Sequence, residues 1–387
     1  MKIAKPNIVI FLNAFWNNGK GMSGGDWMLI QILKRIRKDF SQIECYTNHD
    51  GKKVIESDVD KIHFQQSPRF FDKFPLIVNY FLRTTLSLKI IFKKKFQILY
   101  GGSDFFPDVL PAFFYKIFHP NSKWFQCIFH IYTDWKKRPG SKIKNWFAEY
   151  LQKFSFFFAK KADKIIVINI QTKDELVKLG FKKEKLVLNT PGIDIDYFRN
   201  LEIKSETKKY QGSFLARLHP AKGIFDLVEI WSEVNKKIPE AKLAIIGGGG
   251  EEIKNELKSK IKDKGLENSI DILGFLENDK SFSIIKKSDV FLFPSHEEGF
   301  GIVIAEAMAC GTPVISWNLS VYENLFENYS KKIEEGDLKD FSEKVIDFIE
   351  NKPNDKIQAA NKFVQKYSWD EIAKKHLEIL MTGNKDA

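Results

Sequence analysis

The sequence predicts an α/β protein built from two doubly wound domains. A chain of 387 residues is too long for one ordinary hydrophobic core and suits two domains of common size. Strand-like and helix-like patterns alternate along its whole length, as they do in parallel sheets covered by helices. The stretch over 191–210 is polar enough to be the linker. We therefore expect a first domain over 1–198 and a second from 199, with a ligand site in the cleft between them.

The first half contains seven strand-like runs, which together suit one doubly wound domain. The run nearest the start has only about six consecutive apolar residues and no cleavage site after it, so we interpret it as a buried strand rather than a signal peptide. The predicted strands span residues 7–13, 42–48, 61–66, 97–101, 124–132, 164–170 and 185–189.

The second half contains five apolar, β-branched runs, most of them followed by a helical pattern, and they predict the second domain. These strands span residues 212–217, 242–248, 269–274, 289–295 and 312–317. An amphipathic helix is predicted over 366–380, because Trp369, Ile372, Ala373 and Leu377 recur at helical spacing.

The cysteines and apolar runs exclude several classes of protein. Cys45, Cys127 and Cys310 are odd in number and widely spaced, so neither a disulfide framework nor a zinc site is indicated, and a reducing compartment is expected. The apolar run over 74–82 ends well before the roughly 20 residues that a spanning helix needs. We therefore expect no transmembrane helix.

Positive charge is concentrated in the first half of the chain. Lysines and arginines minus acidic residues give +16 for residues 1–200 and −5 for 201–387, which accounts for the net +11. Stretches 69–96 and 144–161 combine these cations with aromatic residues, which suits helices lying on an anionic membrane surface. A phenylalanine-rich core with solvated lysines explains the pattern equally well. Nucleic-acid binding is not expected, because no recognised nucleic-acid module is present.

Two cations follow the first strand of the second domain. Arg217 and Lys222 lie in the stretch RLHPAKG, directly after the strand, at the edge where open α/β sheets bind ligands. A guanidinium and an ammonium in such a crevice can neutralise separate oxygens of a diphosphate. The alternative is a pair of solvated surface cations.

Glycines follow two other strands of this domain. Gly247 and Gly248 open a run of four glycines just before a predicted helix, where backbone could approach a ligand closely, although a flexible turn explains the run as well. Gly299, Phe300 and Gly301 are predicted to begin a helix, whose free N–H groups favour an anion.

Two glutamates flank that helix start. Ser295 and Glu298 have the spacing of a capping box, but two glycines in the first turn would be a poor way to build a helix. Glu306 lies among apolar residues in a helix predicted to be buried, where an unpaired carboxylate would cost several kcal/mol. Ligand hydroxyls are therefore candidate partners for these carboxylates.

These residues resemble the signature of retaining glycosyltransferases of family 4, which have the GT-B fold of two facing Rossmann-like domains. The segment from Glu298 to Glu306 resembles the family's two glutamates separated by seven residues. Arg217 and Lys222 resemble its pyrophosphate motif, residues 245–250 (IIGGGG) its glycine turn, and residues 189–194 (NTPGID) the loop before the linker. The resemblance implies a donor domain over 199–368 and a terminal helix, about 369–387, that packs back on the first domain.

The resemblance implies a role for each matching residue of the second domain. Arg217 and Lys222 would hold the diphosphate of a nucleotide sugar, Glu298 the hydroxyls of its sugar, and Glu306 the ribose hydroxyls. The remaining donor-binding positions would be Gly247, Gly248, Gly274, Phe275, Gly299, Phe300, Gly301 and Ile302.

In the first domain the resemblance implies two contact points with the donor. Gly24 and Gly25 match the family's glycine loop near the diphosphate, and His130, at a predicted strand end, matches the histidine that approaches the donor sugar. The loop departs from the family pattern at Asp26 and Trp27. The catalytic set implied is His130, Arg217, Lys222 and Glu298.

The implied reaction is a retaining sugar transfer from a UDP- or GDP-sugar, without a further cofactor or a metal. Cations on the departing diphosphate would stabilise its developing charge, and no enzymatic nucleophile is expected. Residues 58–60 and 194–196 both spell Asp-x-Asp, a pattern of metal-using transferases of another fold, and we expect no catalytic metal at either.

A glycan or lipid-linked acceptor in envelope polysaccharide or glycolipid synthesis is the expected partner. The implied localisation is cytoplasmic, with peripheral contact at the inner face of the membrane as one interpretation. A nucleotide-sugar epimerase of the same architecture and a non-enzymatic basic surface-binding protein remain as alternatives.

Overall fold

The computed structural model describes residues 5–15, 23–93, 95–132, 135–136, 142–203, 209–322, 325–326 and 329–382. The chain divides into two compact units. The N-terminal unit comprises Met1–Pro191 with Trp369–Ala387, and the C-terminal unit comprises Gly192–Ser368. The first unit thus ends seven residues before the boundary that the polar linker suggested. Beyond that point Ile193 donates its backbone N–H to the Tyr367 carbonyl oxygen (2.7 Å), within the second unit.

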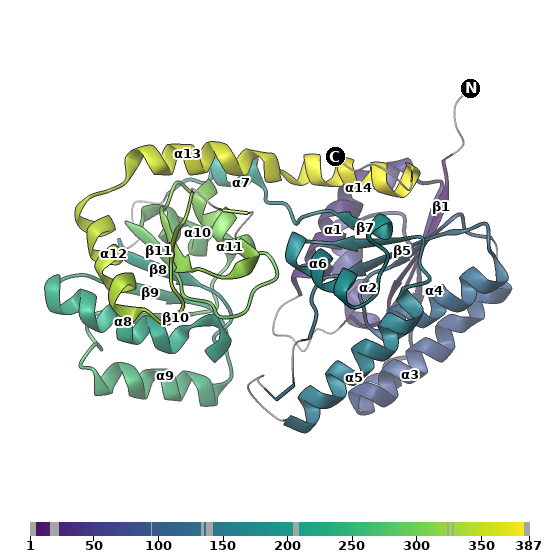
Figure 1. The fold of residues 1–387 in the computed structure, drawn as a ribbon, viewed down its shortest axis with the longest axis horizontal. Helices are drawn as coiled ribbons and strands as arrows, with labels where there is room; N and C mark the ends of the chain where they lie inside the picture. Colours follow the sequence, from purple (N-terminus) through teal and green to yellow (C-terminus); the bar gives the residue numbers. More distant parts are fainter. Residues whose placement is uncertain are drawn as a thin grey trace. The chain divides into compact units, whose positions relative to one another are not determined.

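The N-terminal unit is a seven-stranded parallel sheet in the order β3-β2-β1-β4-β5-β6-β7 (Figure 1). Its strands are β1 (Asn7–Leu12), β2 (Gln42–Thr47), β3 (His63–Gln66), β4 (Ile98–Gly101), β5 (Lys123–Ile128), β6 (Lys164–Val167) and β7 (Leu186–Leu188). Its helices are α1 (Gly24–Ile36), α2 (His49–Asp58), α3 (Leu76–Ser87), α4 (Phe106–Phe118), α5 (Lys142–Ala159), α6 (Ile170–Lys178) and α14 (Trp369–Thr382). Helix α4 packs against both α3 and α5, and α1 packs against α14.

The C-terminal unit is a six-stranded parallel sheet in the order β10-β9-β8-β11-β12-β13. Its strands are β8 (Gly212–Leu215), β9 (Leu243–Ile246), β10 (Ile270–Gly274), β11 (Val290–Phe293), β12 (Val314–Trp317) and β13 (Lys331–Ile333). Its helices are α7 (Ile195–Asn200), α8 (Ile224–Lys237), α9 (Glu251–Asp263), α10 (Asn278–Lys287), α11 (Ile302–Ala309), α12 (Leu338–Glu350) and α13 (Asn354–Val364).

The central strands are fully buried because helices cover parallel sheets. In β1 every residue after Asn7 is buried, which explains its unbroken apolar run. In each sheet the strand order reverses once, beside β1 and beside β8, and open α/β sheets bind ligands at the carboxyl ends of the strands at such a reversal. The sheets therefore point to the loops after β1, β4, β8 and β11.

The structure confirms the predicted α/β class and corrects several strand ends. β5 stops at Ile128 and β8 at Leu215, so His130 and Arg217 lie in the loops beyond them. Strand β13 was not predicted, because two of its three residues are lysines. Helix α14 begins at Trp369, three residues after the predicted start.

Cys45, Cys127 and Cys310 are free thiols and all three are buried. Burial raises the pKa of each thiol, so each stays protonated in the folded chain. Within the described residues no helix is both long and apolar enough to cross a membrane.

Candidate functional site

Lys222 and Glu298 meet at the carboxyl edge of the C-terminal sheet. Lys222 closes a short 3-10 helix (Pro220–Lys222) after β8, and Glu298 lies in the loop after β11. The Lys222 Nζ lies 2.6 Å from Glu298 Oε1 and donates to the Glu297 carbonyl oxygen at 2.8 Å. This pair joins the loops of two strands at the reversal of strand order, where a ligand site is expected.

Arg217 is the second cation at this edge. Its side chain is exposed, and its guanidinium forms no ion pair or hydrogen bond with the other described residues. Burial, followed by the charges of Arg217 and Lys222, lowers the pKa of His219 below its ordinary value. The loop after β8 therefore presents a local positive field in which an anion would be stabilised.

Two glycines allow the loops after β8, β9 and β11 to pack backbone to backbone. Gly223 has φ +71°, and a Cβ there would lie 1.8 Å from the Pro294 carbonyl oxygen. Gly247 has φ +149°, and a Cβ there would lie 1.7 Å from the Ala216 carbonyl oxygen. No side chain fits either position, so these glycines serve close packing of the site loops rather than flexibility.

The segment around Glu298 precedes helix α11 and does not cap it. Ser295 Oγ donates to Glu298 Oε1 at 3.0 Å, but α11 begins only at Ile302, after Gly301 with φ +78°. The sequence predicted that Gly299, Phe300 and Gly301 begin the helix. In the structure they precede it and lead into it. Phe300 is buried against Phe326 and Tyr367, so only its backbone is available to a ligand.

Glu306 lies in the middle of α11, eight residues after Glu298. Its side chain is partly buried and makes no hydrogen bond with the other described residues. Burial raises the pKa of its carboxyl to about 7. An unpartnered carboxylate in a helix of mostly buried apolar residues is the kind of group that a ligand hydroxyl would satisfy.

Gly274 and Phe275 lie at the end of β10. Gly274 has φ +70° with open space around it, and the Phe275 side chain is 80 % exposed. A Cβ on Gly248 would lie 3.9 Å from the Phe275 Cβ, so the glycine turn after β9 and this aromatic ring are neighbours. The exposed ring is free to stack on a planar group.

His296 is a further ionisable residue at this edge, and the sequence did not single it out. Its Nε2 lies 3.0 Å from Asp226 Oδ2, and its Nδ1 lies 2.6 Å from Glu335 Oε1. Hydrogen bonds to these two carboxylates raise the pKa of His296 to about 9. The charged ring thus fixes the segment that leads to Glu298, through partners 70 residues before it and 39 after it.

In the N-terminal unit, Gly24 and Gly25 open helix α1. Ser23 caps the helix by accepting from the Asp26 N–H at 3.1 Å, and burial raises the pKa of Asp26 to about 6. A Cβ on Gly25 would lie 2.6 Å from the Phe129 ring, so this glycine lets the helix start approach the segment after β5. Residues 16–22, which include the first glycines of the predicted loop, lie outside the described residues.

His130 lies in that segment after β5, and α5 holds it in place. Gln152 Nε2 donates to the His130 carbonyl oxygen (2.8 Å) and to Asp104 Oδ2 (2.6 Å), while Gln152 Oε1 accepts from the Tyr132 N–H (2.8 Å). Burial raises the pKa of Asp104 to about 6. Of the predicted site residues, Gly24, Gly25 and His130 belong to the N-terminal unit and the others to the C-terminal unit.

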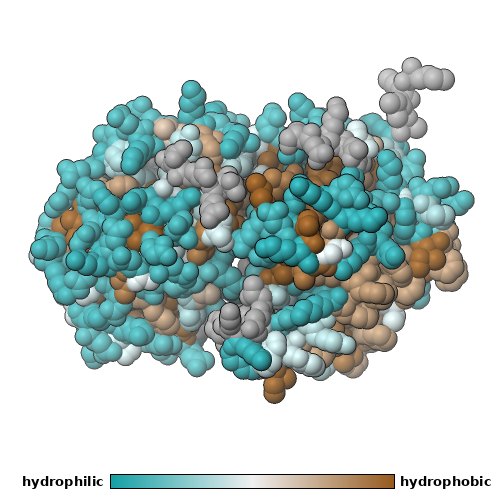
Figure 2. Space-filling view, viewed as in Figure 1, coloured by the Kyte–Doolittle hydropathy of each residue, from teal (hydrophilic) through white to brown (hydrophobic). Residues whose placement is uncertain are grey.

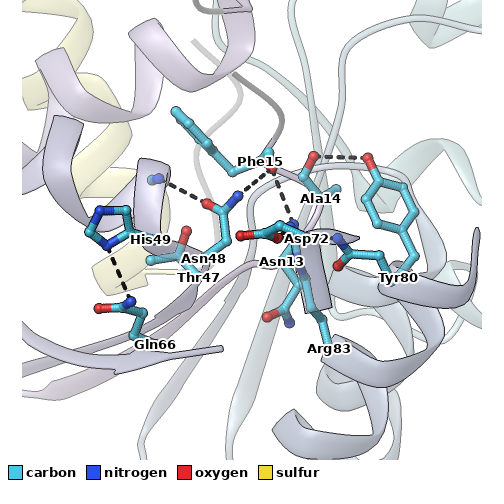
Figure 3. Close-up of polar contacts among 12 residues, drawn as sticks. Asn13, Ala14, Phe15, Thr47, Asn48, His49, Gln66, Asp72, Tyr80 and Arg83 are labelled. Atoms are coloured by element: carbon cyan, nitrogen blue, oxygen red, sulfur yellow. Dashed lines mark hydrogen bonds and ion pairs between the residues drawn. The ribbon is translucent and has the colours of Figure 1, made fainter. Parts of the chain in front are cut away.

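A polar cluster that the sequence did not reveal surrounds the end of β1 (Figure 3). Arg83, 1 % exposed, donates to the carbonyl oxygens of Asn13 (2.7 Å) and Phe15 (3.2 Å) and pairs with Asp72 (2.7 Å). Asp108 accepts from the Asn13 N–H at 2.6 Å, and burial raises its pKa to about 8. The cluster fixes the backbone that enters the glycine loop.

Both Asp-x-Asp sequences have structural roles. Asp194 caps α7 by accepting from the Tyr197 N–H at 3.1 Å, and Asp196 pairs with Arg199 at 2.8 Å. Asp58 pairs with Lys34 at 3.3 Å. Among the described residues no group of three or more His, Cys, Asp or Glu side chains could hold a metal ion.

Comparison with known proteins places this site in a recognised fold. The Anabaena protein HepE in complex with UDP-glucose superposes with a TM-score of 0.73 at 17 % identity, over 97 % of this chain and 99 % of that one. The chain therefore has the GT-B fold, an α/β fold with two parallel sheets. This class was predicted from the sequence and is confirmed.

Residues 199–379, slightly less than half of the chain, match the family model described as Glycosyl transferases group 1. An uncharacterised glycosyltransferase of Methanocaldococcus jannaschii is 33 % identical over 172 residues, which span 41 % of each chain. The GPI3 subunit of phosphatidylinositol N-acetylglucosaminyltransferase from Saccharomyces cerevisiae is 21 % identical over 364 residues, 90 % of this chain and 75 % of that one.

Proposed function

We propose that the protein is a retaining glycosyltransferase of family 4 that transfers a sugar from a nucleoside diphosphate sugar to a glycan or lipid-linked acceptor. The observation that carries the proposal is the Lys222–Glu298 pair, with Arg217 beside it, at the reversal of strand order in a Glycosyl transferases group 1 domain. Two cations and a carboxylate at one sheet edge suit a diphosphate joined to a polyhydroxyl sugar.

Each site residue has a distinct task in this proposal. Arg217 and Lys222 neutralise the departing diphosphate, and this lowers the barrier because negative charge develops there as the glycosidic bond breaks. Glu298 exchanges its bond to Lys222 for hydroxyls of the donor sugar, and Glu306 accepts hydrogen bonds from the ribose. His130, Gly24 and Gly25 contact the donor from the N-terminal unit. No enzymatic nucleophile and no metal is assigned.

The donor that we propose is a UDP-sugar. Support comes from HepE, whose structure contains UDP-glucose, and from the exposed Phe275 ring beside the glycine turn, which suits stacking on a planar base. A GDP-sugar is the second choice. We propose a lipid-linked acceptor of the cell envelope because the yeast relative is named for transfer to phosphatidylinositol. The corresponding localisation is the cytoplasmic face of a membrane.

The test is a thermal shift screen with UDP-glucose, UDP-galactose, UDP-N-acetylglucosamine and GDP-mannose. A donor at 100 times its Kd should stabilise the folded chain by about 2.7 kcal/mol, since it binds the folded state alone. Lys222→Ala should abolish the shift. Lys236→Ala, which removes an exposed lysine paired with Glu233, should retain it.

Two results would contradict the proposal. One is a failure of every donor to raise the Tm of the unmodified chain. The other is formation of a new sugar nucleotide without any acceptor, which is the signature of an epimerase.

A further inference from the structure

Helix α3 is inverted relative to an ordinary surface helix. Its buried side carries polar residues, Asn79, Tyr80, Arg83, Thr84 and Ser87. Its outward side carries Leu76, Ile77, Val78 and Phe81, which are between 41 % and 61 % exposed. A helix on a soluble surface normally buries its apolar stripe and exposes its polar one. An apolar partner that covers this outward side would therefore stabilise the helix.

The buried polar side of α3 forms hydrogen bonds within the N-terminal unit. Arg83 and Tyr80 donate to backbone carbonyl oxygens at the end of β1, the Tyr80 hydroxyl to Ala14 at 3.0 Å (Figure 3). Ser87 Oγ donates to Asn13 Oδ1 at 3.2 Å. These bonds fix the rotation of α3 about its axis, so its apolar side cannot turn inward.

Helix α5 exposes a second apolar stripe. Its members recur at spacings of three and four residues, so they share one helical face. They are Ile143 (80 % exposed), Trp146 (47 %), Tyr150 (59 %), Phe154 (43 %) and Phe157 (70 %). The Trp146 and Tyr150 rings stack with centroids 5.8 Å apart. The opposite face carries Gln152, which holds the segment after β5.

The two stripes belong to one side of the N-terminal unit, since α4 packs against both helices. Apolar surface gathers there in Figure 2, over the region where Figure 1 draws α3, α4 and α5. Phe70 and Phe74, 56 % and 44 % exposed, lie in the segment that leads into α3. A contiguous exposed apolar patch marks an interaction surface.

The positive charge around these two helices favours an anionic partner. Residues 69–96 contain seven lysines and arginines and one acidic residue. Residues 136–161 contain eight lysines and arginines and one acidic residue. Two copies of so basic a face would repel each other, whereas an anionic lipid surface would attract it. Tryptophan and tyrosine with flanking lysines are also the residues that favour the boundary between headgroups and acyl chains.

We propose that the N-terminal unit docks on an anionic bilayer through the outward faces of α3 and α5. The inner faces of the same helices hold the backbone after β1 and the segment after β5 that carries His130, so docking would present these segments beside the membrane. This inference deepens the membrane localisation of the proposed function by naming the surface that docks, and its test needs neither donor nor acceptor.

The experiment is flotation of the full chain with vesicles of phosphatidylglycerol and phosphatidylcholine, compared with phosphatidylcholine alone. The chain should float with the anionic vesicles, and added salt should weaken this because it screens the lysines. The triple variant Ile143→Ser, Tyr150→Ser, Phe157→Ser should partition about tenfold less, since it removes apolar area at exposed positions. Ile170→Ser with Val177→Ser, on exposed positions of α6, is the matched control and should float unchanged.

Three results would overturn the proposal. One is no flotation of the unmodified chain with anionic vesicles, and another is equal flotation of the triple variant. The third is a dimer in sedimentation velocity that the triple variant converts to monomer, because the face would then join two copies of the chain. Thermal shift by a UDP-sugar is measured on the same proteins without lipid, so a failure of donor binding is recognised separately.

Discussion

Glu298 and Glu306 lie eight residues apart and meet opposite environments. Glu298 is ion-paired with Lys222 at 2.6 Å and accepts from Ser295. Glu306 has no partner among the described residues, and its burial raises its pKa to about 7. The first carboxylate is stabilised by the loop around it, whereas the second lowers the stability of the fold whenever it is ionised.

Glu306→Gln should therefore raise stability and reduce donor binding. Between pH 4.5 and about 7 the unfolded chain has released this proton while the folded chain retains it, so the free energy of unfolding falls as pH rises through that window. Above pH 7 the penalty is constant at roughly 3 kcal/mol, because the pKa of this carboxyl is 4.5 in the unfolded chain and about 7 in the folded one, and glutamine removes it.

The measurement is the Tm of both proteins at pH 4 and pH 8, with and without a UDP-sugar. The variant should gain stability at pH 8 only and lose the shift caused by the donor. If the UDP-sugar raised the Tm of the variant as much as that of the unmodified chain, Glu306 would not be a donor-binding residue.

At the residue scale, the sequence located the charged groups but not their partners. Arg217, Lys222 and Glu298 each follow a strand, and strand ends are readable from apolar runs. The bonds of Lys222 to Glu298 and of His296 to Asp226 and Glu335 join positions 39 to 76 residues apart. Such contacts depend on the packing of several loops, which no local pattern records.

At the scale of elements, the site depends on how closely its loops approach one another. The short helix after β8 packs against the loop after β11 through Gly223, and the turn after β9 packs against the loop after β8 through Gly247. A glycine run alone predicts only a turn. The requirement for glycine becomes specific once the neighbouring backbone is known.

Gly223→Ala should destabilise the chain far more than Gly265→Ala. Both glycines have positive φ, +71° and +67°, but a Cβ at 223 meets the Pro294 carbonyl oxygen at 1.8 Å, whereas nothing lies within 4 Å of one at 265. Strain alone costs about 1 kcal/mol, so Gly265→Ala should lose about that much.

Urea unfolding measures both variants. Gly223→Ala should lose at least about 3 kcal/mol, because backbone must move. It should also lose donor binding, since Lys222 precedes it. If both variants lost the same free energy of unfolding, the backbone of the loop after β8 would be able to move at little cost.

Helix α3 shows the limit of reading elements from periodicity. Its buried positions are polar and most of its exposed positions are apolar, yet the pattern does not say which face is buried. The ordinary assumption gives the wrong answer here because Arg83 and Tyr80 satisfy carbonyl oxygens at the end of β1. The helix itself is local, but its orientation is decided by a strand about 70 residues earlier.

At the scale of the whole molecule, the chain leaves the N-terminal unit and later returns to it. Helix α14 packs on α1, with Trp369, Ile372 and Leu380 buried. Arg35 pairs with Asp370 at 2.6 Å, and the buried His376 ring bonds to Asn189 at 2.9 Å. The N-terminal unit therefore needs an element that follows the whole C-terminal unit in the sequence.

A chain that ends after Ser368 should lose the fold of the N-terminal unit and keep that of the C-terminal unit. The three buried apolar side chains alone contribute about 5–8 kcal/mol, which is comparable with the whole stability of a domain. Calorimetry should show one cooperative transition, and UDP should still shift it.

A chain that ends after Thr382 retains all of α14 and is the control for this truncation. It should melt like the full chain. If the chain ending after Ser368 kept both units folded, α14 would be an accessory to the N-terminal unit.

The three buried thiols give each unit its own chemical reporter. Cys45 and Cys127 belong to the N-terminal sheet and Cys310 follows α11 in the C-terminal unit. Because burial keeps each thiol protonated and covered, an alkylating reagent can reach it only when its surroundings open. Mass spectrometry after a short labelling pulse would therefore time the opening of the two units separately in the unaltered protein, without any introduced probe.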